Sequence, residues 1–220
     1  MFQVRLFKGL KEPHYTAEQL GKAESLSGFW KNLLFLLGLT LLLSLFTSFY
    51  GIGNDILSPE LNGHLATEFE AMKSLFAIGQ MAWKLFEALF ILTIPSLFFW
   101  AISDIEWKKF IVVQQEILVI FLLEKAALIP FALFLGITSH LSNPFSLGII
   151  GQYVTDQPFI LIFLAKMSIF TIWAVILQYK YVKVLAGKPA KGTALFVIGF
   201  NVILLFISTF ITLIDLETLL

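Results

Sequence analysis

Two apolar runs separated by a short basic segment constrain this chain more than any other feature. The runs cover residues 160–177 and 193–214, and the segment between them, 178–192, contains lysines and no acidic residue. A helix that crosses a bilayer needs about 20 apolar residues, so each run is long enough. Because basic residues collect on the cytoplasmic side of membrane proteins, this pattern predicts a transmembrane hairpin with its basic end in the cytoplasm.

The composition of the chain also favours lipid as its solvent. Of its 220 residues, 58% are hydrophobic, and the mean hydropathy is +0.87. A soluble domain of this size could not bury so much apolar surface. The sequence has no cysteine, and its histidines are far apart (His14, His64 and His140), so we expect no metal and no cofactor. It shows no basic groove that would indicate nucleic-acid binding.

The apolar pattern predicts an all-α, polytopic membrane protein with five transmembrane helices. Together these helices form one domain, residues 28–214. The expected spans are residues 28–50, 75–102, 110–137, 160–177 and 193–214.

The remaining segments are expected to lie outside the bilayer. Residues 1–27 form a cytoplasmic segment with a short helix at 17–27 capped by Thr16, and its stretch 2–11 fits either a segment lying on the membrane surface or a solvated tail. Residues 215–220 form an external tail. The two external loops are the acidic stretch 51–75 and the stretch 138–157, which contains no Lys or Arg.

The distribution of basic residues predicts the orientation. Outside the hydrophobic runs, almost all of them fall in segments that five spans would place on one side, so the N-terminus should be cytoplasmic and the C-terminus external. These residues are Arg5, Lys8, Lys11, Lys22, Lys31, Lys108, Lys109, Lys180, Lys183, Lys188 and Lys191.

Ionisable residues within the spans are the main candidates for a site. Each one costs at least about 2.5 kcal/mol near the bilayer centre unless it is paired or hydrated. Helical spacing predicts that Lys84 pairs with Glu87, and the most economical arrangement pairs Lys166 with Glu124. The full set is Lys84, Glu87, Glu116, Glu124, Lys125 and Lys166.

Three roles fit these buried charges. They can tie the helices together as structural ion pairs, they can line a polar cavity for a substrate or a proton path, or they can face a transmembrane helix of a partner. The sequence contains no catalytic motif of the nucleotide-binding, metalloprotease or serine-hydrolase kind. We therefore expect that the protein is not an enzyme.

The fourth predicted span contains Phe170 and Trp173, and a turn with Gly187 and Gly192 precedes the fifth. In these residues the two spans resemble those of the YIP (Ypt-interacting protein) domain family. The Asp-Leu-Tyr-Gly-Pro motif of the eukaryotic branch is missing from this sequence, which indicates the bacterial branch. The resemblance implies a multi-pass protein of the bacterial plasma membrane.

The resemblance also implies a function. One bacterial member of similar size and layout is associated with an ABC-type exporter and its membrane-fusion adaptor, in protection against a secreted toxin. An accessory subunit that assists assembly or regulation of such a complex, with membrane lipids and these membrane proteins as its partners, is the leading hypothesis. The alternative is a small transporter or permease subunit that uses the buried charges of the second to fourth spans.

Overall fold

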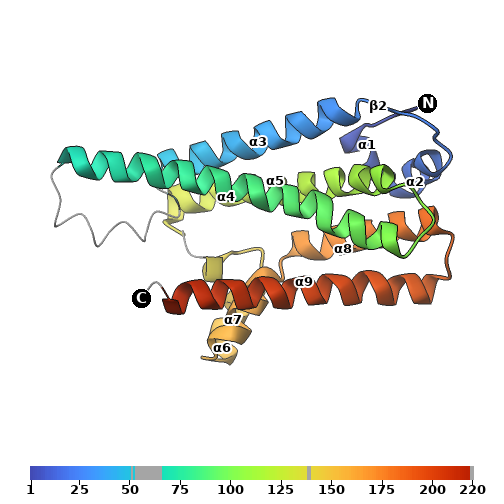
Figure 1. Cartoon of the computed structure of the whole chain (residues 1–220). Coiled ribbons are helices and arrows are strands. Elements are labelled where there is room, and N and C mark those ends of the chain that lie inside the picture. The colour runs from blue at the N-terminus through green and yellow to red at the C-terminus, as the bar shows by residue number, and fades with distance from the viewer. Residues whose placement is uncertain (51, 53–65, 138–139, 219–220) are drawn as a thin grey trace.

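The computed structural model describes the chain except residues 51, 53–65, 138–139 and 219–220, and within its helices it describes no side chain at 66–71, 73, 140 and 215–218. The described part is almost entirely helical (Figure 1). Its long helices are α3 (Phe29–Phe49), α4 (Ala66–Ala101), α5 (Trp107–Leu135), α8 (Ile169–Ala186) and α9 (Ala190–Thr218).

Five helices are long and apolar enough to cross a membrane, as the sequence predicted. They are α3, α5 and α8 over their full lengths, α4 from Ser74 and α9 up to Ile214. The helices run through Pro95 in α4 and Pro130 in α5, and α9 extends into the stretch predicted to be an external tail. Most of the predicted loop 51–75 lies outside the described residues.

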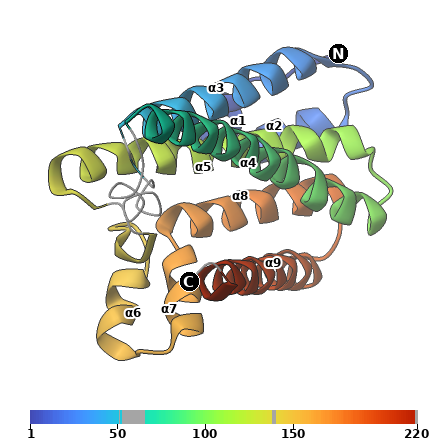
Figure 2. The same cartoon turned by 60° about the vertical axis from the view of Figure 1, so that its left-hand side comes forward.

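Helix α5 is the centre of the bundle. Every residue from 109 to 120 is buried, because α3, α4, α8 and the N-terminal helix α1 (Leu6–Lys11) surround this half of the helix. Its Ile, Leu and Val residues are distributed on all sides, as expected of a helix without a lipid-facing or solvent-facing side. Figure 2 shows α5 between the α3–α4 layer and the α8–α9 layer.

The N-terminal segment is folded against one end of the bundle. It consists of β1 (Phe2–Gln3), α1, α2 (Pro13–Gly21) and β2 (Leu26–Ser27), and the two short strands pair in parallel. The short helix predicted at 17–27 is present, but its bounds and its cap were wrong. Helix α2 ends at Gly21 and begins at Pro13, a residue favoured in the first turn, so Thr16 lies inside it.

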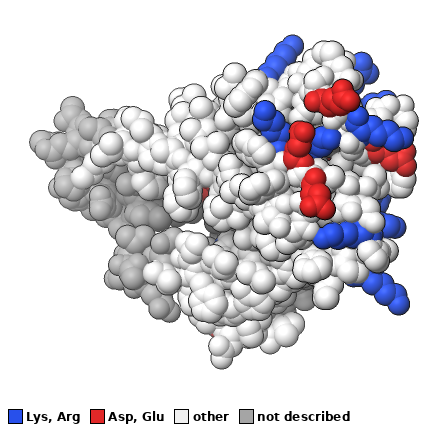
Figure 3. Space-filling view, turned by 45° about the vertical axis from the view of Figure 1, so that its right-hand side comes forward, with Lys and Arg blue, Asp and Glu red and all other residues white. Residues whose placement is uncertain are grey.

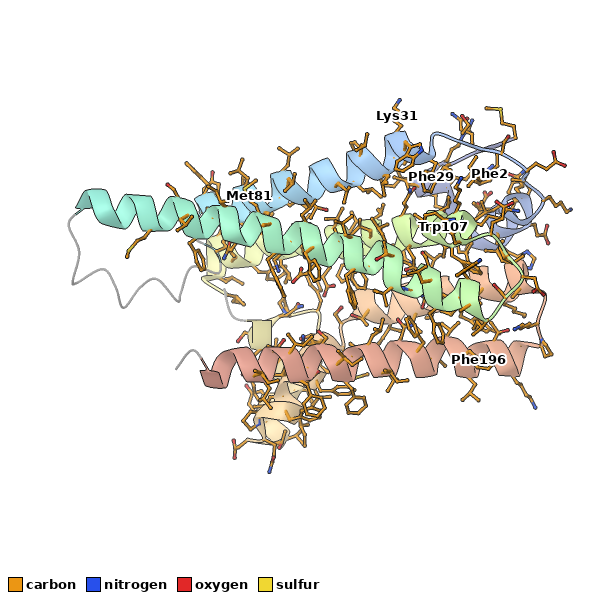
Figure 4. The ribbon with its side chains drawn as sticks, in the orientation of Figure 1. Phe2, Phe29, Lys31, Met81, Trp107 and Phe196 are labelled. Carbon is orange, nitrogen blue, oxygen red and sulfur yellow. The ribbon has the colours of Figure 1, made fainter. Side chains whose placement is uncertain are left out.

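The apolar side chains of the stretch 2–11 explain why this segment is ordered. Phe2, Val4 and Leu6 are buried, and α1 packs on α5. The amide of Asn32 in α3 also donates to the Val4 carbonyl oxygen at 2.9 Å. The apolar side of the stretch therefore faces the protein. In Figure 4, Phe2 and Phe29 lie at the same end of the bundle as Trp107, whereas Lys31 points away from it.

The predicted fourth span, 160–177, is broken in the structure. Helix α7 (Pro158–Lys166) ends before Ser168, and the candidate span is α8, which begins at Ile169. The break is held by backbone bonds to the preceding loop, from the Leu147 amide to the Met167 carbonyl at 3.1 Å and from the Ile169 amide to the Phe145 carbonyl at 3.0 Å. Mean hydropathy cannot reveal such a break.

Two neighbouring predictions also need correction. The predicted loop 138–157 contains the short helix η2 (His140–Ser142) and α6 (Gly148–Val154), which packs on α7 as a helical hairpin. The predicted basic turn 178–192 is mostly helical, because α8 continues to Ala186. The helix is terminated by Gly187, whose φ of 60° lies in the left-handed region that glycine adopts readily.

Ser168 is expected to stabilise the start of α8. Its hydroxyl oxygen accepts from the Thr171 amide at 3.1 Å, so it caps the helix. Replacing Ser168 with alanine should lower the free energy of unfolding by about 1 kcal/mol. Thermal unfolding of the purified chain in detergent would measure the loss. Thr93→Ala is the control, since the exposed Thr93 hydroxyl lies inside α4 and only donates back to the Leu89 carbonyl of its own helix, and an equal loss in both variants would contradict the capping role.

Candidate functional site

The ionisable side chains of α4 and α5 meet at one carboxylate. The Lys84 ammonium donates to both oxygens of Glu87 at 3.1 Å, and the Lys125 ammonium donates to Glu87 Oε2 at 3.3 Å. The predicted pair of Lys84 and Glu87 is therefore confirmed. Lys125 joins it from the neighbouring helix, although the sequence prediction gave it no partner.

The predicted pair of Lys166 and Glu124 is wrong. Lys166, at the end of α7, donates to the carbonyl and hydroxyl oxygens of Ser208 and to the Thr212 hydroxyl at 2.9 Å. Glu124 instead accepts from the Asn143 amide at 3.3 Å. The break before α8 is the physical reason, because it allows α7 to pack on α9 and turns Lys166 toward the polar groups of that helix.

Four of these charged residues form what we call the lysine layer: Lys84, Glu87, Lys125 and Lys166. Lys166 lies within electrostatic range of both Lys84 and Glu87. At 1.5 Å per residue, Lys84, Lys125 and Ser208 (the partner of Lys166) all lie about 26–27 Å from the ends of their helices nearest the N-terminal segment. Three helices therefore bring positive charge to one level. In Figure 4 the label of Met81, one turn before Lys84, marks this part of α4.

The lysine layer is open at the side of the bundle. The side chains of Lys84, Glu87 and Lys125 are 32%, 34% and 40% exposed. Two pockets of the described structure lie elsewhere, one beside Phe2 and Thr16 and one beside Trp100 and Ile105. The layer is thus a partly exposed surface and not a closed chamber.

Glu116 lies apart from the lysine layer, in a second polar cluster beneath the N-terminal segment. It is 1% exposed and packs against Gly9 of α1 so closely that a Cβ atom added to this glycine would be 1.8 Å from Glu116 Oε1. The buried hydroxyl of Tyr181 in α8 lies next to the carboxylate, and the buried hydroxyl of Thr16 in α2 lies next to that of Tyr181, both at geometries looser than full hydrogen bonds. We call Gly9, Thr16, Glu116 and Tyr181 the cap cluster.

Sequence analysis missed most of the cap cluster. Of its residues only Glu116 was named as a candidate for the site, while Gly9 and Tyr181 were not. The consecutive polar residues Gln114, Gln115 and Glu116 point in three directions around α5 and are all buried. That triplet was the available signal that this helix is enclosed on all sides.

The residues that carry the resemblance to the YIP family are spread along α8 and α9. The Phe170 ring meets Phe145 edge-on at 5.5 Å, and Trp173 is 38% exposed on the side of α8. Gly187 terminates α8, and Gly192 lies in the first turn of α9 with no atom near the position of a Cβ. The structure does not bring these four residues together into one site.

Two kinds of chemistry fit the charged residues. The lysine layer can hold α4, α5, α7 and α9 together, and its exposed ammonium groups can attract an anion. In the part of the chain that the structure describes, no three His, Asp or Glu side chains are placed to hold a metal ion. The chain matches no known family model, no curated protein and no solved structure.

Proposed function

We propose that this chain is a multi-pass protein of the bacterial plasma membrane, with a cytoplasmic N-terminus and an external C-terminus. The distribution of charge supports this orientation. Figure 3 shows Lys, Arg, Asp and Glu gathered at the end of the molecule that carries the N-terminal segment, while the rest of the described surface in this view is almost free of charged side chains. Lysine and arginine concentrate on the cytoplasmic side of membrane proteins.

Within this membrane we propose a non-enzymatic role in the assembly or regulation of a larger complex. The resemblance to the YIP domain family suggests which complex, an ABC-type exporter with its membrane-fusion adaptor, acting in protection against a toxin. The chain would contribute surfaces that bind these partners and no chemistry of its own.

The observation that carries this proposal is the hairpin of α6 and α7. It stands across the direction of α8 and α9 and projects beyond them (Figure 2). Phe159 and Phe163 anchor it on Phe206 of α9, with ring centroids 6.0 and 4.9 Å apart. Tyr153 and Val154 at its tip are 88% and 75% exposed. A rigid hairpin that presents apolar side chains away from the bundle is suited to contact a neighbouring subunit.

Photo-crosslinking from the hairpin tests the proposal. A photoreactive phenylalanine analogue at position 153 should crosslink to an exporter or adaptor subunit when the chain is expressed in its own cells and purified in mild detergent. The same analogue at Phe134, which is 85% exposed at the end of α5, is the matched control. Failure to recover either subunit, or equal crosslinking from both positions, would contradict the proposal.

The partial exposure of the lysine layer favours one other function, transport of a small molecule past Lys84, Glu87 and Lys125. The two functions differ in what these charges do. A variant with apolar residues at all three positions should still assemble with its partners if the charges are structural. A transporter that uses them would lose activity even though its fold is intact.

A further inference from the structure

The lysine layer carries more positive than negative charge among its described side chains. Lys84 and Lys125 contact the carboxylate of Glu87, and Lys166 lies within electrostatic range of it. The only other carboxylate that acts on Lys125 among the described residues is that of Glu124, so three positive charges stand against two negative ones. Lys166 already donates to three oxygens of α9. A lysine ammonium has three N–H donors. In the described structure Lys125 uses one of them, toward Glu87, so its ammonium can also donate to another anion.

The depth of the lysine layer in the bilayer can be estimated from α3. The Ser48 hydroxyl, in the last turn of α3, donates to the Gln80 side chain of α4 at 2.8 Å. Helix α3 has 21 residues and is therefore about 31 Å long, close to the thickness of the hydrocarbon core. Lys84 follows Gln80 by about one helical turn. The layer thus lies about 6 Å inside the end of a helix that just spans the hydrocarbon core, a depth from which long lysine side chains can extend to the lipid headgroups.

An exposed apolar track leads from the layer into the C-terminal half of α4. Trp83 stacks on Phe86 with ring centroids 5.7 Å apart, and Phe86 is followed by Phe90 at 6.4 Å. These rings are 49%, 57% and 40% exposed. Trp83 and Phe90 are four and three residues from Glu87, so the track runs beside the charged groups on the same helix. Tryptophan also favours the interface between headgroups and hydrocarbon.

From this geometry we propose that Lys84 and Lys125 bind the anionic headgroup of a phospholipid in the leaflet opposite the N-terminal segment. The phosphate completes the charge balance of the layer, and an acyl chain lies along Trp83, Phe86 and Phe90. The ligand is a lipid and not a soluble anion, because the apolar track supplies contacts that free phosphate cannot use. This site is independent of the proposed assembly role.

Native mass spectrometry of the full chain in detergent tests the site. The chain should bind dioleoyl-phosphatidylglycerol about tenfold more tightly than dioleoyl-phosphatidylcholine, a difference of about 1.4 kcal/mol. The variant Lys84→Gln/Lys125→Gln should lose this preference. Lys84→Arg/Lys125→Arg should keep it, and so should Lys31→Gln/Lys108→Gln, which removes two exposed lysines at the other end of the bundle.

A substitution that should strengthen lipid binding gives a second test, because a variant that merely loses its fold would not bind the lipid more tightly. Glu87→Gln removes the carboxylate that Lys84 and Lys125 share, so this variant should bind phosphatidylglycerol more tightly than the unmodified chain. Soluble glycerol phosphate should not compete with the lipid at equal concentration. An unchanged preference in the Lys84→Gln/Lys125→Gln variant, weaker binding in Glu87→Gln, or full competition by glycerol phosphate would each overturn the proposal.

Discussion

Replacing Glu87 with alanine should destabilise the protein more than the loss of any other charge in its five candidate membrane helices. The substitution leaves Lys84 and Lys125 without the carboxylate that both contact. Removing one member of a buried ion pair costs about 3–5 kcal/mol. Because these side chains are about one-third exposed, solvent screening reduces the expected loss to about 2 kcal/mol. Unfolding in mixed micelles of mild detergent and SDS would measure it.

A combined substitution separates charge pairing from other effects. The variant Lys84→Met/Glu87→Leu/Lys125→Met removes all three charges at once, so it should regain most of the stability that Glu87→Ala loses. Glu106→Ala is the control, since Glu106 is exposed at the start of α5. A triple variant as unstable as Glu87→Ala would show that the stability comes from packing and not from the ion pairs.

Replacing Gly9 with alanine should destabilise the N-terminal segment, although helix propensity predicts the opposite. Alanine is favoured over glycine inside a helix by about 1 kcal/mol. Here the new Cβ would lie 1.8 Å from Glu116 Oε1 and 2.2 Å from Cδ, and Glu116 is fully buried. Overpacking of this kind costs about 1–3 kcal/mol, so the net change should be a loss. Hydrogen exchange of residues 1–27 should become faster.

Shortening the side chain of Glu116 should compensate for the Gly9→Ala substitution. In a Glu116→Ala background the space beside α1 is open, so Gly9→Ala should no longer destabilise and the two substitutions should be strongly non-additive. Gly192→Ala is the matched control, because no atom lies within 4 Å of a Cβ at that helical position. Equal effects of Gly9→Ala with and without Glu116 would contradict the close contact.

The two charged sites differ in how far the sequence could predict them. The pair of Lys84 and Glu87 lies on one helix at a spacing of three residues, so its geometry follows from the helix alone. The partners of Lys125, Glu124 and Lys166 come from other elements. Asn143 reaches Glu124 from a loop, and Ser208 reaches Lys166 only because the chain breaks before α8. The spacing of residues along the sequence does not predict contacts of this kind.

The sequence alone determined that the chain folds into helices and that five of them are long and apolar enough to cross a membrane, since length and hydropathy are properties of continuous segments. The tertiary structure decided where the fourth of these helices begins, which helix is enclosed, and which charges meet. The apolar run 160–177 contains both α7 and α8, and what separates them is backbone bonding to residues 145–147. Contacts between distant segments cannot be read from the hydropathy of either segment.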